Sequence, residues 1–585
     1  MPSFASSASF LVFLKNQLAL RENSLLPFQT MFMPTTKEEL NTLGWDIPDI
    51  IIVTGDTYID SPFIGVAVIG KHLIKHGFKV AVIAQPSIHS SKDIIRLGEP
   101  RLFWGVTAGS IDSTVANYTA SRKYRRQDDF TPGGMNNRPN RASIVYCNLI
   151  RKYFKNTKPV VLGGLEASLR RIAHFDVFDS AVRRSILPDS KADVLVYGMA
   201  EKTIVELAQA FRDQTDWKGI AGICYMAGQA VPSFHRLPSY ESVRDTPAEF
   251  LKMSIDFHRF AGDTAVGFIQ KHGNRFLVHN PPQKPVTSDE LDQIYEMDFE
   301  HDVHPFYKTG KVKALDTIRQ SVTAHRGCFG QCHFCAIAVH QGKQIISRTP
   351  KSIIREITKH TKKPGFNGII YDIGGPTANM YGTKCKQNWK CRNKRCLQPR
   401  PCPNLIPGHK TQMDLLSQIT KIPGVKKMFV SSGIRHDLVM IDEKWRNAYI
   451  EQLVRYHISG QIKVAPEHSE ESVLRLMNKP SVDTVLQFKK LFANACRKFR
   501  KRYFLTYYLM AAHPGCSPQN MRRLNAFLIN RLKTIPEQIQ IFTPTPATLS
   551  TAMYHCETDL QGNRIYCDKT VNQMARQKQI LRNKK

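Results

Sequence analysis

The chain has 585 residues, of which 42% are hydrophobic, 22% charged and 9% aromatic. These fractions exclude a disordered chain, a collagen-like repeat and a membrane protein, and no apolar stretch reaches the roughly 18 residues of a membrane-spanning helix. Lys and Arg number 82 against 49 Asp and Glu, and the formal charge of +33 favours association with phosphate backbones or acidic surfaces. We therefore expect a cytoplasmic protein of about three or four domains, with RNA among its candidate partners and no membrane partner.

Residues 1–47 are predicted to be an N-terminal extension. A short apolar run from Phe10 to Leu14 lacks the preceding basic region of a signal peptide. Basic residues are densest at residues 497–502 and in a predicted C-terminal tail, residues 556–585, which has no acid after Asp568. We interpret these basic stretches as a solvated helix face and a loose terminus.

Strands alternate with helices from residue 49 onward. Residues 49–56 form an apolar run that ends in a turn, as expected of a buried parallel strand, and residues 66–76 form a helical stretch closed by Gly77. Further strands are predicted over residues 79–84, 102–106, 159–164 and 192–198. Five strands separated by helices predict an α/β domain over residues 48–215, with a doubly wound parallel sheet.

A second series of strands and helices follows a less regular region. Residues 216–312 contain scattered His and Pro, and we interpret them as a connecting region. Six strands are then predicted, over residues 318–323, 368–372, 427–431, 461–465, 503–510 and 538–542. This series, over residues 313–555, predicts a full or partial TIM-like (βα)6 barrel with its active site at the carboxyl ends of the strands.

Seven of the thirteen cysteines fall within residues 328–402. A disulfide scaffold is small and secreted, so clustered thiols in a large chain indicate metal or redox chemistry in a reducing compartment. Cys328, Cys332 and Cys335 follow the first barrel strand, separated by three and two residues. Structural zinc normally takes four ligands, whereas three thiols leave one position of a metal–sulfur centre open.

The Cys-x3-Cys-x2-Cys spacing, with Phe334 before the last cysteine, resembles the signature of the radical SAM superfamily. The neighbouring segments resemble one group of that superfamily, the YgiQ-type proteins, from residue 34 to about residue 555. The matching stretches are residues 34–39, 53–58, 162–171, 347–348, 374–381, 432–435, 465–468 and 512–515. The resemblance implies a [4Fe–4S] cluster at Cys328, Cys332 and Cys335 whose open iron binds S-adenosylmethionine, and reductive cleavage of this cofactor to a 5′-deoxyadenosyl radical.

The resemblance also implies roles around S-adenosylmethionine. Gly374 and Gly375 end the second barrel strand, where superfamily members present backbone groups to the methionine amino group. Arg435 follows the third strand and is expected to pair either with the methionine carboxylate or with Asp437. Glu467 ends the fourth strand and is either an acceptor for ribose hydroxyls or an ordinary surface carboxylate.

A second group of cysteines lies in a Lys- and Arg-rich insertion at residues 383–403, and its members are Cys385, Cys391, Cys396 and Cys402. Four thiols at these spacings suit a tetrahedral zinc site or an auxiliary Fe–S cluster. YgiQ-type proteins also carry four cysteines here, which favours a metal site of either kind over four reduced thiols.

The N-terminal domain resembles the cobalamin-binding-like domains that precede many radical SAM cores. The Asp-x-His-x-x-Gly loop that supplies a lower cobalt ligand is absent, and residues 60–65 carry Pro62 where the histidine would stand. We therefore do not expect cobalamin to bind, and we interpret the domain as a platform for a substrate or partner.

The sequence thus predicts a radical SAM enzyme with an unidentified substrate and a protein reductant such as flavodoxin or ferredoxin. The basic surface makes an RNA-modifying methyl- or methylthiotransferase of the same superfamily the alternative in detail. A different class of function is a non-catalytic zinc or Fe–S protein that binds nucleic acid through its positive charge.

Overall fold

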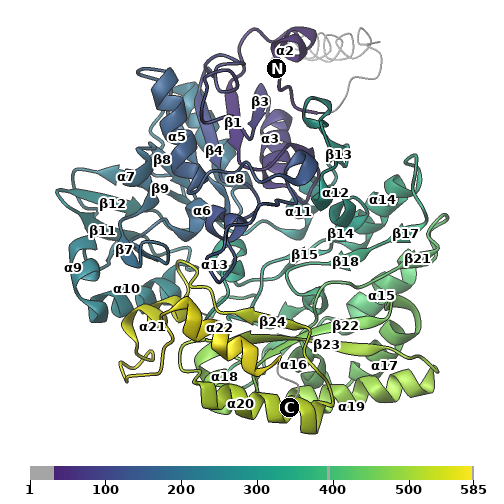
Figure 1. The fold of residues 1–585 in the computed structure, drawn as a ribbon. Helices are drawn as coiled ribbons and strands as arrows, with labels where there is room; N and C mark the ends of the chain where they lie inside the picture. Colours follow the sequence, from purple (N-terminus) through teal and green to yellow (C-terminus); the bar gives the residue numbers. More distant parts are fainter. Residues whose placement is uncertain (1–31, 392–394, 583–585) are drawn as a thin grey trace, which may run out of the picture.

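The computed structural model describes residues 32–391 and 395–582. The N-terminal half is built around one nine-stranded sheet, and the C-terminal half around shorter parallel strands (Figure 1). Residues 1–31 of the predicted extension and residues 583–585 of the predicted tail lie outside the described residues.

The parallel part of the large sheet follows the predicted pattern. Each of the five segments predicted as strands contains one parallel strand of the large sheet. These strands are β1 (Ile50–Thr54), β3 (Val80–Ala84), β4 (Phe103–Thr107), β5 (Val160–Leu162) and β8 (Val194–Val196). The strands lie in the order β3-β1-β4-β5-β8, so the winding reverses between β1 and β4. In open α/β sheets, ligands bind outside the carboxyl ends of the strands at this switch point.

Side chains of β1 alternate between two cores. Ile52 packs in one core with the apolar faces of α3 (Gly65–Lys75) and α8 (Glu201–Asp213). Val53 packs in the other core with α5 (Ala142–Tyr153). Because helices cover both faces of the parallel sheet, the sequence of each strand is a continuous apolar run. This arrangement confirms a mixed α/β fold.

The predicted connecting region extends the same sheet. Beyond β8 the sheet continues through β9 (Ile223–Ala227), β12 (Arg275–His279), β11 (Phe268–His272) and β10 (His235–Arg236). β11 and β12 form an antiparallel hairpin around Gly273 and Asn274. A Gly-Asn pair between two strands is a hairpin signal, which the interpretation as a connecting region overlooked.

Residues 32–47 belong to the domain as well. The amide of Val82 in β3 donates to the carbonyl of Pro34 at 3.0 Å, and the Thr35 hydroxyl donates to the carbonyl of Val82 at 2.7 Å. Helix α2 (Lys37–Thr42) follows, and a capping box closes its N-terminus. The described part of the predicted extension therefore covers the β3 edge of the sheet.

All six segments predicted for the barrel contain strand. β14 pairs with β18 and β17 with β21, while β22, β23 and β24 form a parallel sheet in which β24 pairs on one side only. These strands are β14 (Ser321–Thr323), β17 (Ile369–Ile370), β18 (Asp372–Gly374), β21 (Lys427–Met428), β22 (Gln461–Glu467), β23 (Phe504–Ala511) and β24 (Gln538–Ile541). The strands pair in separate short sheets within the described ranges, so the number of strands in one (βα)6 barrel stays a prediction.

The first of these strands starts later than predicted, because residues Lys313–Ile318 form helix α12. Helix α14 (Pro350–Thr361) lies between β14 and β17, and the long helix α19 (Asp483–Lys498) precedes β23. None of the helices within the described ranges has the length and apolar character of a membrane span.

The predicted C-terminal tail folds back onto the core instead of extending into solvent. Helix α22 (Val571–Ile580) buries Gln577, whose Nε2 donates to the carbonyl of Cys516 at 2.7 Å. Helix α21 (Leu549–Cys556) lies beside α10 (Pro247–Phe260) of the N-terminal half, as Figure 1 shows. The C-terminal segment therefore contributes to the junction of the two halves.

A buried ion pair joins the two halves. Arg326, the last residue of β15 (His325–Arg326), donates to the carboxylate of Glu201 at the start of α8, and its Nε donates to the Tyr295 hydroxyl at 3.2 Å. Arg326 is 4% exposed and Glu201 2%. Burial alone would raise the pKa of Glu201, but Arg326 outweighs this effect and holds the pKa below its usual range.

We expect Glu201→Gln to lower the free energy of unfolding by about 3 kcal/mol, because it leaves the charge of Arg326 buried without a partner. The contribution of the pair is present at neutral pH and is lost as the pH falls through the lowered pKa of Glu201. Urea unfolding at neutral and acidic pH measures both effects. Glu206→Gln, at an exposed position of the same helix, is the control, and equal losses in the two variants would contradict this role.

Candidate active site

The three cysteines of the first group lie on one loop between β15 and α13 (Ile337–Gln341). Gly327 opens the loop with φ +85°, and a Cβ there would collide with the Gln344 carbonyl, so only glycine fits. At the far end, the His333 amide donates to the carbonyl of Met477 at 3.0 Å. The chain around the loop therefore fixes its backbone from two sides.

The thiols of this loop are largely covered. Burial raises the pKa of Cys328, and it raises the pKa of Cys335 to about 12. These thiols stay protonated until a metal displaces the proton. No three His, Cys, Asp or Glu side chains of the described residues lie close enough together to hold one metal ion. The ligands of a four-iron cluster each bind a different iron, so three thiols spread along one loop fit that cluster better than a single ion.

Arg435 lies directly against the cysteine loop. Its Nη1 is 3.6 Å from the Cys332 sulfur, and a Cβ on Gly330 would collide with this nitrogen. Its Nε and Nη2 donate to the carboxylate of Asp437 at 3.0 and 2.6 Å. Burial alone would lower the pKa of Arg435, but Asp437 keeps it above its usual range. Arg435 thus pairs with Asp437, one of its two expected partners, and turns its remaining nitrogen toward the loop.

The glycine pair is packed by protein side chains. A Cβ on Gly374 would collide with the Ser432 hydroxyl, and a Cβ on Gly375 would collide with the ring of His325. The Ser432 amide is held by the carboxylate of Asp372 at 3.0 Å. Gly374 and Gly375 also line a cavity between the two halves. A side chain at either position would therefore collide with neighbouring side chains and would also take up space that a ligand could use.

His325 is a candidate site residue that the sequence analysis did not identify. Its ring is 0% exposed, and neither ring nitrogen has a hydrogen-bond partner of good geometry among the described residues, although the Thr377 backbone acts to raise its pKa. Burial lowers its pKa to about 4, so the ring is neutral at pH 7 and offers one donor and one acceptor. Buried polar groups are nearly always paired, so a ligand in the adjoining cavity is the expected partner.

Glu467 ends β22 at a point where the register against β23 shifts. Its φ of +69° is strained for a residue other than glycine, and such strain gathers at functional sites. Its side chain is 8% exposed, and burial raises its pKa although Lys479 and Arg435 oppose the shift. Glu467 is therefore a buried carboxyl near the loop and not an ordinary surface carboxylate.

A cavity of about 600 Å³ lies between the two halves at the switch point of the large sheet. Asp56, which follows β1, and Gly109, which follows β4, line one side, and His325 lines the other. The cavity continues between the sheet and helices α3 and α8, where it is lined by Ile52 and Ile204. This is the place where the topology predicts a ligand.

A smaller cavity of about 170 Å³ adjoins the first. Cys332 and Cys335 line it, while Gly198, Arg326 and His340 line both cavities. Two of the three loop cysteines therefore face the space that the two halves enclose.

The second cysteine group lies on a small hairpin. Cys385 ends β19 (Lys384–Cys385) and pairs with Leu405 of β20 (Leu405–Ile406). The Cys402 amide donates to the carbonyl of Cys396 at 2.9 Å. These contacts bring the backbones of three of the four cysteines together in one hairpin.

The hairpin also covers the first loop. The ring of Phe329, beside Cys328, packs on Trp389 with the ring centroids 5.8 Å apart. The structure does not describe residues 392–394, which lie between Cys391 and Cys396. Among the described residues, the four thiols do not form a site for a single ion. The structure thus brings the second group next to the first without assigning it a metal.

Comparison with known proteins identifies the family. The family model described as radical SAM N-terminal matches residues 32–321. A UPF0313 protein of Fusobacterium nucleatum is 46% identical over 565 residues, which cover 95% of this chain and 99% of that protein. The chain belongs to the UPF0313 family. A second UPF0313 protein, from Thermotoga neapolitana, is 47% identical over 566 residues with the same coverage of both chains. The YgiQ-type resemblance and membership of the radical SAM superfamily are confirmed.

Among solved structures, TsrM from Kitasatospora setae has a similar fold. TsrM is a radical S-adenosylmethionine methyltransferase, solved with cobalamin and a [4Fe–4S] cluster bound. Its TM-score is 0.51 at 14% identity, covering 87% of this chain and 78% of TsrM.

This finding overturns one prediction about the UPF0313 chain. The prediction against cobalamin is contradicted at the level of the fold, because TsrM, which has a similar fold, was solved with cobalamin and a [4Fe–4S] cluster bound. The expectation rested on Pro62 in place of a cobalt-binding histidine. A cavity at the switch point can hold a ligand by shape and apolar contact, without any bond to its metal.

Proposed function

We propose that this UPF0313 protein is a radical SAM enzyme that holds a [4Fe–4S] cluster at Cys328, Cys332 and Cys335. The observation that carries the proposal is the position of these thiols on one glycine-containing loop, two of them facing a space enclosed by both halves. When bound and reduced, such a cluster supplies the electron that cleaves S-adenosylmethionine to methionine and a 5′-deoxyadenosyl radical. The proposal includes a reductant such as flavodoxin or ferredoxin and a reducing, cytoplasmic setting.

The surrounding residues have the chemistry to hold S-adenosylmethionine. Arg435 offers a guanidinium nitrogen beside the loop for a carboxylate, while Asp437 keeps it oriented. Glu467 offers a buried acceptor for a hydroxyl group. Gly374 and Gly375 present their backbone to the cavity, and the enclosed space keeps water away from a reactive radical.

Cys332→Ala tests this function. The full-length chain, reconstituted without oxygen, should bind about four irons and form 5′-deoxyadenosine after reduction. The variant loses a cluster ligand, so nucleoside formation should fall by roughly 100-fold or more. Cys496→Ala, which removes a cysteine outside both groups, is the control. Cleavage that persists in C332A would contradict the ligand assignment, and bound zinc without iron would favour the non-catalytic alternative.

We also propose that the larger cavity binds cobalamin, as TsrM does. The supporting observation is the apolar continuation of the cavity along β4, where Gly105 is partly exposed although it lies in the middle of a buried sheet. Gly163 and Gly198 at the mouth, with Ile52 and Ile204 further in, are the residues that would hold the group. A bound cobalamin would supply methyl transfer.

Gly105→Leu should fill this space and lower cobalamin binding by roughly tenfold or more, because the leucine occupies volume that the ligand needs. The nearest atom to a Cβ at this position is 3.5 Å away, so the substitution fits the empty cavity. Retention of hydroxocobalamin after gel filtration, read from its visible absorbance, measures the effect. Gly219→Leu, at an exposed position, is the control. Equal retention by wild type and G105L would rule the cavity out as this site.

We propose a metal site at the second cysteine group, supported by the hairpin that gathers Cys385, Cys396 and Cys402. Cys402→Ser should remove about one zinc or about four irons per chain and leave the cluster at Cys328, Cys332 and Cys335 in place. Elemental analysis of wild type and variant distinguishes the two metals. An unchanged metal content would show that the group consists of reduced thiols.

A further inference from the structure

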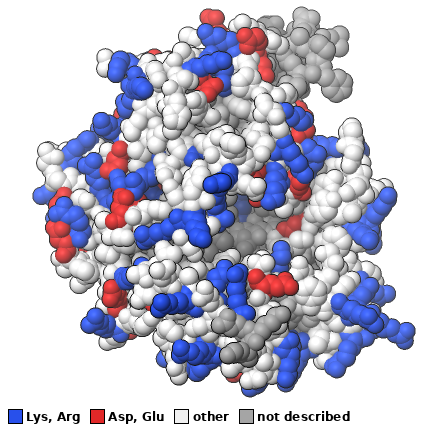
Figure 2. All heavy atoms as spheres, viewed as in Figure 1, with Lys and Arg blue, Asp and Glu red and all other residues white. Residues whose placement is uncertain are grey.

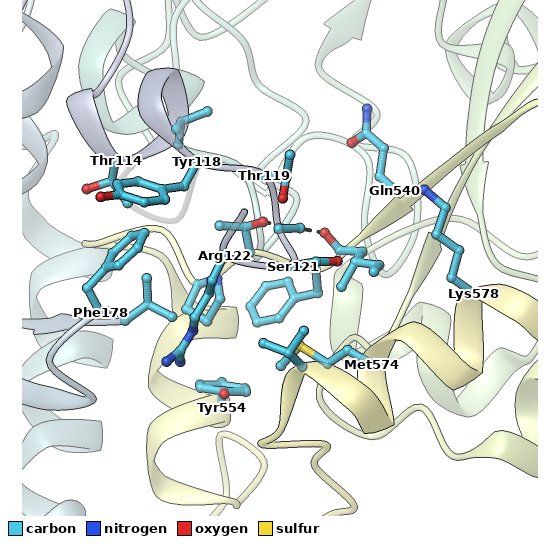
Figure 3. A pocket seen from close by; sticks show the side chains of 18 of the residues that line it. Thr114, Tyr118, Thr119, Ser121, Arg122, Phe178, Gln540, Tyr554, Met574 and Lys578 are labelled. Carbon is cyan, nitrogen blue, oxygen red and sulfur yellow. Dashed lines mark hydrogen bonds between the residues drawn. The ribbon is translucent and has the colours of Figure 1, made fainter. Parts of the chain in front are cut away.

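A further cavity of about 450 Å³ lies beside β24, apart from the space between Cys332 and the large sheet. It is bordered by residues 114–125 and 177–178 of the N-terminal half, by residues 539–544 at β24, and by the C-terminal helices α21 and α22 (Figure 3). None of the functions proposed above uses it.

Aromatic rings lie on two sides of this cavity. Tyr118 packs against Phe178 with the ring centroids 4.6 Å apart and against Tyr124 at 5.6 Å. Tyr554 and Phe542 lie 5.9 Å apart on the opposite side. Figure 3 shows Tyr118, Phe178 and Tyr554 around the opening. Tyr118 and Phe178 are partly exposed, whereas Tyr554 and Phe542 are buried, so the first two rings are the accessible stacking surfaces for planar groups.

All charged residues that line the cavity are cationic, and they are Arg122, Arg125, Lys569 and Lys578. Lys569 pairs with Glu557 at 3.3 Å, and Arg125 donates to the carbonyl of Tyr118 at 3.2 Å. Among the described residues, no Asp or Glu lines the cavity beside Arg122 or Lys578. Burial and nearby Arg582 lower the pKa of Lys578, as expected of a cation in a cavity that no acid lines.

The loop that carries Arg122 continues this charge onto the surface. Residues 122–126 read Arg-Lys-Tyr-Arg-Arg and are all exposed, with Tyr124 at 50%. The face in Figure 2 likewise shows Lys and Arg spread widely, with fewer Asp and Glu between them. A basic loop with an aromatic residue inside it is typical of nucleic-acid-binding surfaces.

The floor of the cavity is the open edge of β24. Three consecutive residues of β24, 539–541, line the cavity, whereas a strand that turned only one face toward it would contribute alternate residues. Residues 542–544, which follow the strand, continue the lining. β24 pairs with β23 and with no other strand among the described residues. Backbone amides and carbonyls of this edge therefore face no partner strand among the described residues, although the Ile541 carbonyl accepts from the Thr543 hydroxyl at 3.5 Å.

The same segment leads to the cysteine loop. Pro544 lines this cavity, and Ala547 lines the smaller cavity together with Cys332 and Cys335. The Ser550 amide then donates to the carbonyl of His333 at 2.9 Å. A ligand seated along β24 would thus lie on the segment that borders the proposed radical site.

We propose that this cavity binds an unpaired nucleotide of a single-stranded nucleic acid. Its rings offer stacking, its cations offer partners for phosphates, and the edge of β24 offers hydrogen bonds to a base. An extended peptide could also pair with such an edge, but cations without an acid favour a polyanion. Binding of the nucleic acid requires neither the cluster nor S-adenosylmethionine. The inference rests on the proposed function only where it makes the bound nucleic acid the substrate of the radical enzyme.

The test uses fluorescein-labelled oligouridine and oligothymidine of about ten nucleotides and the reconstituted full-length chain. Fluorescence anisotropy should show binding that weakens with salt, and Arg122→Gln with Lys578→Gln should reduce affinity about tenfold and lower the salt slope by about 1.4. The matched control, Lys501→Gln with Arg502→Gln, removes the same charge from the basic stretch at residues 497–502. An equal loss in the control, or no binding by wild type, would overturn the proposal.

Two further readouts separate the remaining outcomes. Photocrosslinking of 4-thiouridine in the oligonucleotide should label Tyr118, Phe178 or Tyr554, and labelling confined to other segments would refute the site. Uridine monophosphate that competes as well as the strand at equal nucleotide concentration would show a free-nucleotide site and overturn the single-strand claim. 5′-Deoxyadenosine formation without oligonucleotide is measured on the same preparations, so failure of the radical chemistry is recognised separately from failure of binding.

Discussion

The fixed position of Arg326 is the constraint on which the candidate active site depends. Its guanidinium is removed from water and must remain with Glu201 and Tyr295, because separating a buried charge from its partner is costly. Cys328 follows two residues later, so the cysteine loop cannot shift against the large sheet without breaking this pair. Arg326 also lines both interdomain cavities. The sheet, the loop and the enclosed space therefore form one rigid unit.

Glycines around the cysteine loop make room for larger side chains beside it. Gly330 leaves room for Arg435, and Gly375 leaves room for the ring of His325. The result is a guanidinium held beside a sulfur and a neutral imidazole held beside a cavity, both of them buried. Such preorganised polar groups act strongly on a ligand, because they need no rearrangement when it arrives.

The sequence predicted those features that repeat or have a fixed spacing. Apolar runs bounded by turns predicted the five parallel strands, and three spaced cysteines predicted the loop. His325 escaped prediction because a single histidine has no spacing, and its importance comes from two unpartnered nitrogens that only packing reveals. The cavity escaped prediction because Pro62 reveals only a missing cobalt ligand, whereas the cavity arises from a gap between the sheet and its helices.

The segment before α2 has a consequence for how the molecule associates with others. The carbonyl of Pro34 takes the amide of Val82 at the β3 edge, as an added strand would. Proline has no amide hydrogen of its own, so Pro34 cannot donate to a further strand. On this side, the large sheet therefore ends at a residue whose carbonyl accepts a hydrogen bond from β3 but whose nitrogen cannot donate one to a further strand. Within the described residues, this edge therefore offers a second copy of the protein one donor fewer for edge-to-edge growth, which disfavours aggregation of a long, apolar sheet.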